Sequence, residues 1–214
     1  LGNIQQNVPF LAFLIPGLMM MTLINNSFQN SSSSIVASKF SGDLEDIRAA
    51  PISNLQVIGA LSMGALIRGV IVSMVTLLVG EVFYYFTRNE WLGVVHPGSF
   101  LFFTVAGGLL FGLLGISIAF VAKSFDQLTA FTSFVLLPLT YLGGVFISLD
   151  HLSPFWRSIA IWNPLLYLIN GLRYGVLGLT EVSLAASYSM VLISLGFAFV
   201  LASISVTKGS FQRW

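Results

Sequence analysis

NPLLYLINGLRYG, residues 163–175, decides how this chain is arranged at one membrane surface. From Ile159 to Leu172 the chain is apolar enough to enter a bilayer, but Asn163 and Pro164 interrupt the run. About 10 to 14 apolar residues are too few to cross a membrane and are typical of a re-entrant or interfacial segment. Because Pro fits the first turn of a helix and Asn is a good N-cap, we expect a new helix to begin at this break.

The composition places the whole chain in a membrane. Hydrophobic residues make up 56% of the 214 residues and charged residues only 8%, whereas about 25% of a soluble domain is charged. The net charge of +1 gives no indication of nucleic-acid binding, and the absence of Cys excludes disulfides and thiolate metal sites. We expect one all-α integral membrane domain over residues 1–214, surrounded by membrane lipid and without a nucleic-acid partner.

Windows of about 20 apolar residues predict five membrane spans. The re-entrant segment, residues 150–180, lies between the last two of them and should form a helical hairpin. The five spans are expected at 8–34, 62–86, 99–121, 128–147 and 184–206.

Lys and Arg residues collect in cytoplasmic loops and give the orientation. Their excess places the loop after the first span, the 123–127 turn and the C-terminus in the cytoplasm, so the chain would start outside. With Leu1 in place of Met and no basic leader, we expect one span ahead of this sequence, six spans in the native chain and both ends in the cytoplasm. The cytoplasmic charges are Lys39, Arg48, Lys123, Lys208 and Arg213, and the outer ones are Arg88, Arg157 and Arg173.

The inner loop, residues 39–54, reads KFSGDLEDIRAAPISN and is rich in charge. Acidic residues suit the first turn of a helix, and Ser41 or Asp43 can cap its start. Leu44 and Ile47 lie three residues apart on one face. The pattern therefore predicts a short helix with an acidic face and a small apolar edge. It either fills a groove on a cytoplasmic partner or is a solvated loop helix without a partner.

Polar groups inside the spans have two interpretations each. The amides of the first span either line a pathway between two copies of the chain or hydrogen-bond to neighbouring helices. Arg68 and Glu81 lie roughly 20 Å apart on one helix and cannot pair within it. Arg68 therefore either snorkels to the inner surface or takes part in gating. The possible pathway-lining amides are Asn25, Asn26, Gln29 and Asn30.

The third span contains a GxxxG pair, Gly108 and Gly112, which predicts close helix packing. No catalytic, cofactor-binding or metal site is predicted. The sequence has no GxxxxGK[ST] motif, so a P-loop does not bind ATP in this chain. His96 and His151 have no partners at metal-ligand spacing, and among the spans only Glu81 is both acidic and deep.

Three stretches together carry a resemblance to a known family. They are IPGLMMM at 15–21, GDLEDIRAAPIS at 42–53 and GGVFISLDHLSPFWRSIAIWNPLLYLINGLRYGVLG at 143–178. Their order resembles the membrane (permease) subunit of an ABC-2 type exporter, which pairs with a separate ATPase. The most specific match is Gly-Gly-x-Phe, then Trp, Asn-Pro-x-x-Tyr and Leu-Arg, which are here Gly143, Gly144, Phe146, Trp156, Asn163, Pro164, Tyr167, Leu172 and Arg173.

The resemblance implies a homodimeric efflux permease of the bacterial inner membrane, with ATP and Mg bound by the partner ATPase and no cofactor in this chain. The family's N-terminal interface helix and first span have no counterpart here. The stretch at 39–54 would be the cytoplasmic coupling helix, and its contacts with the ATPase would be Asp43, Leu44, Glu45, Asp46, Ile47 and Arg48. The outer re-entrant gate would contain Trp156, Asn163, Pro164, Tyr167 and Arg173.

Two other classes of protein stay open. An ion- or proton-coupled secondary transporter would bind substrate at broken helices near the midplane, but it predicts a second, matching broken segment. A non-transporting scaffold for a cytoplasmic enzyme would keep the acidic helix and would not need the re-entrant hairpin. The cargo, whether drug, lipid or lipid-linked glycan, does not follow from the residues.

Overall fold

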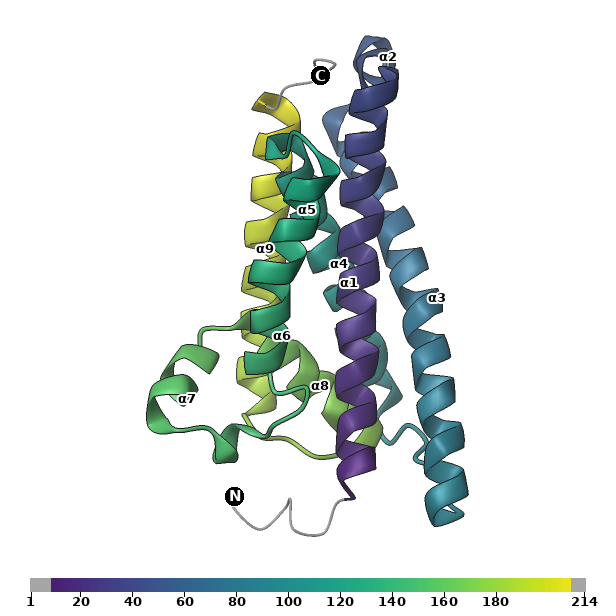
Figure 1. Ribbon diagram of the computed structural model, residues 1–214, viewed down its shortest axis with the longest axis vertical. Coiled ribbons are helices and arrows are strands. Elements are labelled where there is room, and N and C mark those ends of the chain that lie inside the picture. Colours follow the sequence, from purple (N-terminus) through teal and green to yellow (C-terminus); the bar gives the residue numbers. More distant parts are fainter. Residues whose placement is uncertain (1–8, 209–214) are drawn as a thin grey trace.

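The computed structural model describes residues 9–208, except for the side chains of Arg48 and Asp150. Within these residues the regular elements are all helical and form an elongated bundle (Figure 1). The bounds of the helices are α1 Phe10–Ser41, α2 Asp43–Ala49, α3 Asn54–Arg88, α4 Pro97–Val121, α5 Phe125–Phe131, α6 Leu137–Leu142, α7 Pro154–Ala160, α8 Pro164–Leu177 and α9 Leu184–Lys208. The chain is thus an all-α membrane protein, as predicted.

The helices α1, α3, α4 and α9 are long and apolar enough to cross a membrane. The fourth predicted span differs from the prediction of one regular helix. It consists of α5, a π-helical turn at Thr132–Leu136, and α6. Pro138 explains the π turn, because a proline has no N–H to donate and its ring displaces the carbonyl four residues earlier. The predicted end at 147 was wrong, since the helix stops at Leu142 and a glycine turn follows.

Two other predicted boundaries fall short of the helices. α1 continues to Ser41, seven residues past its predicted end, and α3 begins at Asn54, eight residues before its predicted start. A capping box explains the early start of α3, because Ser53 and Gln56 exchange hydrogen bonds there. The windows measured only the length of chain that an apolar bilayer core requires, whereas both helices are longer than that.

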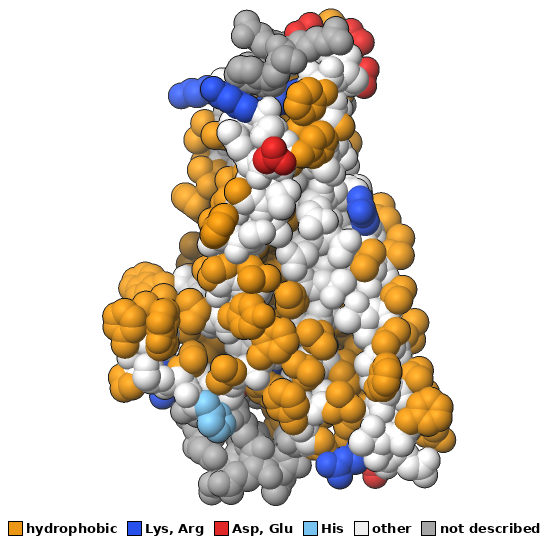
Figure 2. All heavy atoms as spheres, viewed as in Figure 1, with side chains coloured by type: hydrophobic (Ala, Val, Ile, Leu, Met, Phe, Trp, Pro, Cys, Tyr) orange, Lys and Arg blue, Asp and Glu red, His pale blue; other side chains and the backbone are white. Residues whose placement is uncertain are grey.

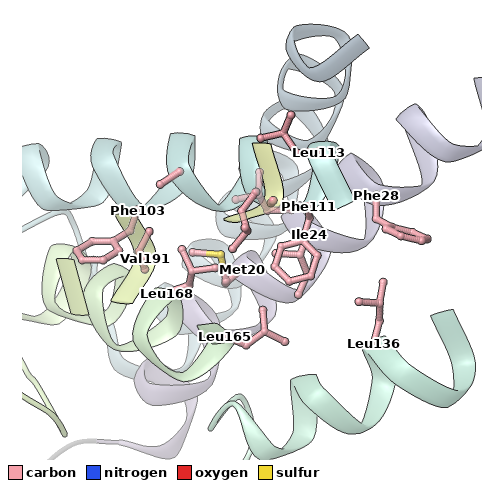
Figure 3. Close-up of a cluster of buried hydrophobic side chains, with 14 of the residues drawn as sticks. Met20, Ile24, Phe28, Phe103, Phe111, Leu113, Leu136, Leu165, Leu168 and Val191 are labelled. Atoms are coloured by element: carbon pink, nitrogen blue, oxygen red, sulfur yellow. The ribbon is translucent and has the colours of Figure 1, made fainter. Parts of the chain in front are cut away.

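α1 is the central helix and packs along α3 and α4, with α8 against its first half. The predicted close packing at Gly108 and Gly112 is confirmed, since a Cβ on Gly108 would lie 2.6 Å from Leu66 Cδ1 and one on Gly112 would lie 3.0 Å from Ala65 Cβ, both in α3. α4 also approaches α1 closely. The Ser31 hydroxyl of α1 donates to the Gly112 carbonyl over 2.8 Å, and a Cβ on Gly115 would lie 2.6 Å from the Phe28 carbonyl oxygen. Side chains from α1, α4, α8 and α9 fill the core around this contact, among them Met20, Ile24, Phe103, Phe111, Leu165, Leu168 and Val191 (Figure 3).

The segments that join the helices gather at two ends (Figure 1). One end, here called the α2 end, carries α2, the α4–α5 turn and the end of α9. The other, the α7 end, carries the α3–α4 loop and the hairpin of α7 and α8. The predicted grouping of loops is therefore correct. Lys39 and Arg173 are not solvated loop charges, however, since both are buried. Without Lys39 and Arg173, the α2 end still has more of the predicted loop Lys and Arg residues than the α7 end has. One of those counted at the α2 end, Arg213, lies outside the described residues.

Candidate coupling and gating sites

The predicted coupling helix exists as α2, joined to α1 by one residue. Gly42 has φ +90°, a left-handed conformation that favours glycine, and serves as both the C-cap of α1 and the N-cap of α2. The predicted side-chain cap was wrong. The Ser41 hydroxyl instead donates to the Asp43 carboxylate over 2.6 Å. α2 therefore turns sharply away from the long central helix.

The two faces of α2 differ. Leu44 is 2% exposed and packs into the chain's own core, and Ile47 is half-buried against it. The acidic side chains Asp43, Glu45 and Asp46 are exposed, and red surface gathers at this tip (Figure 2). Arg48 belongs to the same helix, but its side chain is not among those described. A partner at this end would meet the carboxylates, while Leu44 packs into the core of the chain.

Lys39, three residues before the Gly42 joint, ties α1 to the end of α4. Its ammonium donates to the carbonyls of Ala119, Phe120 and Ala122 over 2.7, 3.0 and 3.2 Å. These are carbonyls that a helix end leaves without intrahelical partners, and they carry the negative end of the helix dipole. All three ammonium protons are thus satisfied although Lys39 is 2% exposed. The next residue, Phe40, stacks on Phe125 at the start of α5 with ring centroids 5.8 Å apart.

The outer break lies where the sequence predicts it. α7 ends at Ala160, and α8 begins at Pro164 with Asn163 as its N-cap. The Asn163 Oδ1 accepts from the Leu165 N–H over 3.0 Å, and its Nδ2 donates to the Leu139 carbonyl of α6 over 2.7 Å. One buried amide therefore starts α8 and attaches it to the end of the broken span.

The remaining predicted gate residues fall into two groups. The Tyr167 hydroxyl of α8 donates to the Ile161 carbonyl over 2.9 Å. This hydrogen bond joins α8 to the turn that follows α7. Trp156 on α7 is 47% exposed. It belongs to an apolar group on α7 and the following turn, which projects from the side of the bundle (Figures 1 and 2). The other large exposed members are Phe155, Ile159, Ile161 and Trp162.

Arg173 is the centre of a buried polar cluster at the α7 end. Its Nη1 lies 3.1 Å from Glu181 Oε1, with side chains 3% and 9% exposed. Its Nη2 donates to the Gly144 carbonyl over 2.9 Å, and the guanidinium carbon lies 3.6 Å from the centre of the Phe13 ring of α1. Glu181 also accepts from the Leu149 N–H over 3.0 Å. The pair therefore joins α8, α1, the turn after α6 and the segment that leads into α9.

Asn170 strengthens this cluster from the middle of α8. Its Oδ1 accepts from the Glu181 and Val182 N–H groups over 2.7 and 3.2 Å. Its Nδ2 donates to the Val182 carbonyl and the Ser187 hydroxyl over 3.0 and 2.9 Å. Neither Glu181 nor Asn170 was predicted from the sequence. The available signal was an Asn inside an apolar helix and an acid eight residues after Arg173.

The four predicted pathway amides lie on one side of α1. Gln29 is exposed, and Asn25, Asn26 and Asn30 are half-buried. The side chains of Asn25 and Asn26 donate to carbonyls of their own helix, Met21 and Thr22, over 2.9 Å each. A pale strip of polar side chains and backbone runs over α1 between the apolar surfaces of α3 and α5 (Figure 2). This strip is called the amide face below.

Arg68 of α3 borders the amide face. Its side chain is exposed, and its Nη1 donates to Asn30 Oδ1 over 3.3 Å. The amide face and α3 are therefore joined by one hydrogen bond between a cation and a neutral amide.

An all-α bundle with four long apolar helices, a short acidic helix at one end and a helical hairpin at the other has the architecture of a multi-pass membrane protein. The profile of the ABC-2 type transporter family matches residues 1–177. The chain is 33% identical over 204 residues to the inner membrane transport permease YadH of Escherichia coli K12, an alignment that covers 95% of this chain and 75% of that protein. The YadH permease of Shigella flexneri matches to the same extent. The chain therefore belongs to the ABC-2 type transporter family and is a multi-pass permease of the bacterial inner membrane.

A second group of relatives is more distant. Nodulation protein J of Neorhizobium galegae is 29% identical over 100 residues, which cover 47% of this chain and 37% of that protein. Nodulation protein J of Rhizobium leguminosarum is 28% identical over 90 residues, which cover 42% and 34% of the two chains.

Proposed function

We propose that this chain is the permease subunit of an ATP-driven exporter and works as a homodimer with two copies of a cytoplasmic ATPase. The ATPase would bind ATP and Mg and would dock on the α2 end. The observation that carries this proposal is α2 itself, a short helix with exposed carboxylates attached to the central helix through Gly42. Membership of the ABC-2 family supports the same assignment.

The contacts around α2 suggest how ATPase closure would move the permease. α2 joins α1 directly through Gly42, so a displacement of α2 acts first on the last turn of α1. Lys39 and Phe40 in that turn contact the end of α4 and the start of α5. The movement would therefore be transmitted to the α4–α5 turn as well as to the central helix, and α1 would move as a rigid body.

The exit would be controlled at the α7 end. Cargo would move between two permease copies past the amide face and leave beside the hairpin of α7 and α8. Asn163 and Arg173 attach this hairpin to α6 and α1. Opening would therefore displace the hairpin as a unit together with these helices, because these contacts and the Tyr167–Ile161 hydrogen bond join its parts.

Co-purification of the full-length native protein in mild detergent tests the proposal. We expect a stoichiometric P-loop ATPase, identified by mass spectrometry, and ATPase activity in the complex. Glu45→Lys combined with Asp46→Lys should release the ATPase, whereas Glu90→Lys, an exposed acid at the α7 end, should leave the complex intact. A dimer that carries no ATPase would overturn the proposal and would direct attention to gradient-driven uptake.

A further inference from the structure

Arg68 is a charge in the apolar part of α3 without a countercharge. By a rise of about 1.5 Å per residue it lies about 21 Å from the start of α3 at Asn54 and about 30 Å from its end at Arg88. Among the described residues its hydrogen-bond partner is the neutral Asn30 amide, and no carboxylate lies within ion-pair distance. Arginine at such a position is costly in a membrane and is normally paired or functional.

No described acid forms an ion pair with Arg68 within the chain. α1, α4 and α9 contain no Asp or Glu between their bounds. Glu81 of α3 is thirteen residues further along and accepts from the Leu92 N–H over 3.0 Å. Glu181 is paired with Arg173.

The surroundings of Arg68 provide donors for an anion. Asn30 is the amide that Arg68 contacts, and its Nδ2 can donate to an anion. Asn26 lies one turn earlier on the same face of α1, and it uses one N–H for its own helix and keeps a second. The guanidinium offers a planar fork of donors that suits phosphate oxygens. Blue cationic surface lies beside the pale strip on α3, away from both ends of the bundle (Figure 2). Together they form an electropositive, donor-rich edge between α1 and α3.

An apolar surface continues from this edge. Ile71, Val75 and Leu78 follow Arg68 at three, seven and ten residues, so they share its side of α3. They are 60%, 55% and 64% exposed. A ligand at Arg68 could therefore place an anionic group at the guanidinium and an apolar chain along α3 toward the α7 end.

We propose that Arg68, with the Asn26 and Asn30 amides, binds the phosphate group of an anionic amphiphile whose apolar chain lies along α3. Two sources share this chemistry, a lipid of the surrounding bilayer and the transported cargo. The second source would give the proposed exporter its substrate class, and that part rests on the proposed function. Binding itself does not require ATP.

The binding test uses the full-length permease, with its ATPase when the two co-purify, and fluorescent phosphatidylglycerol in detergent. Arg68→Gln should weaken binding about tenfold, the loss of one charge-assisted contact. Arg68→Lys should retain part of the affinity, because it keeps the charge and loses the fork. Arg88→Gln at the end of α3 is the matched control and should bind as the native protein does. Equal affinity of Arg68→Gln and the native protein would overturn the site, as would equal retention of phosphatidylcholine.

Translocation of the same probe in proteoliposomes distinguishes the two sources. ATP-driven movement that Arg68→Gln reduces would identify the bound amphiphile as cargo, and binding without movement would identify it as a bilayer lipid. Both results support the site. If no ATPase co-purifies while phosphatidylglycerol still binds through Arg68, the proposed function fails and the site stands.

Discussion

Arg173 and Arg68 are two arginines on apolar helices of the same chain, and their surroundings are opposite. Arg173 is 3% exposed and contacts Glu181, the Gly144 carbonyl and the Phe13 ring. Arg68 is exposed and contacts one neutral amide. A charge that holds helices together must be satisfied by the protein itself, because the apolar interior offers no water. A charge left open on a helix surface remains available to a ligand, which is the distinction that the following variants test.

Glu181→Ala should have the largest effect. It leaves the Arg173 guanidinium buried without a countercharge, and breaking such a pair costs about 3–5 kcal/mol. Thermal unfolding in detergent should show a large fall in Tm. Arg173→Met combined with Glu181→Leu should recover much of the loss, since an apolar pair leaves no unpaired charge. If Glu181→Ala is as stable as the native protein, the Arg173–Glu181 pair does not stabilise the fold and Arg173 is not a structural charge.

Lys39→Met should have the next largest effect on stability, about 1.5–3 kcal/mol, the range for hydrogen bonds made by a charged group. It leaves three carbonyls at the end of α4 without their donor. Lys208→Met, an exposed lysine at the end of α9, is the control. Equal Tm values for the two variants would show that Lys39 is not a structural cation of the Arg173 type.

Asn163→Ala should cost about 1–2 kcal/mol, because α8 loses its N-cap and its attachment to α6. Asn163→Ser separates the two contributions, since it keeps a neutral capping oxygen and removes the amide donor to Leu139. Its Tm should lie between those of the native protein and the Ala variant. If the Ser variant is as unstable as the Ala variant, the cap contributes nothing and the link to α6 carries the whole effect.

Arg68→Gln should have the smallest effect on stability, within about 0.5 kcal/mol, as for an exposed substitution. The variant keeps a polar group beside Asn30 and removes no buried contact. Its Tm should match that of the native protein while its binding of phosphatidylglycerol falls. A fall in Tm comparable to that of Glu181→Ala would place Arg68 with Arg173 as a structural residue.

Features that depend on neighbouring residues were predictable. The break at Asn163 and Pro164 follows from backbone rules, and the centres of the spans follow from the apolar length that a bilayer requires. Short-range rules also misled at the α2 end. Either Ser41 or Asp43 was expected to cap α2, whereas Gly42 occupies the N-cap in a left-handed conformation. Leu44 of α2 is buried in the core, which is a requirement of packing that local capping rules do not include.

The sequence by itself determined that this is a helical membrane protein, where its apolar helices lie and where the outer hairpin breaks, because these depend on composition and local chain geometry. The tertiary structure alone decided the roles of its charges. Lys39 and Arg173 are buried and connect helices, because packing brings carbonyls and a carboxylate within hydrogen-bond distance of them. Arg68 remains exposed, because packing brings only a neutral amide to it. Partners such as Ala119 for Lys39 are 80 residues away along the chain. Such pairings exist only once the helices have packed, since a charge in an apolar environment is stabilised by its contacts in space.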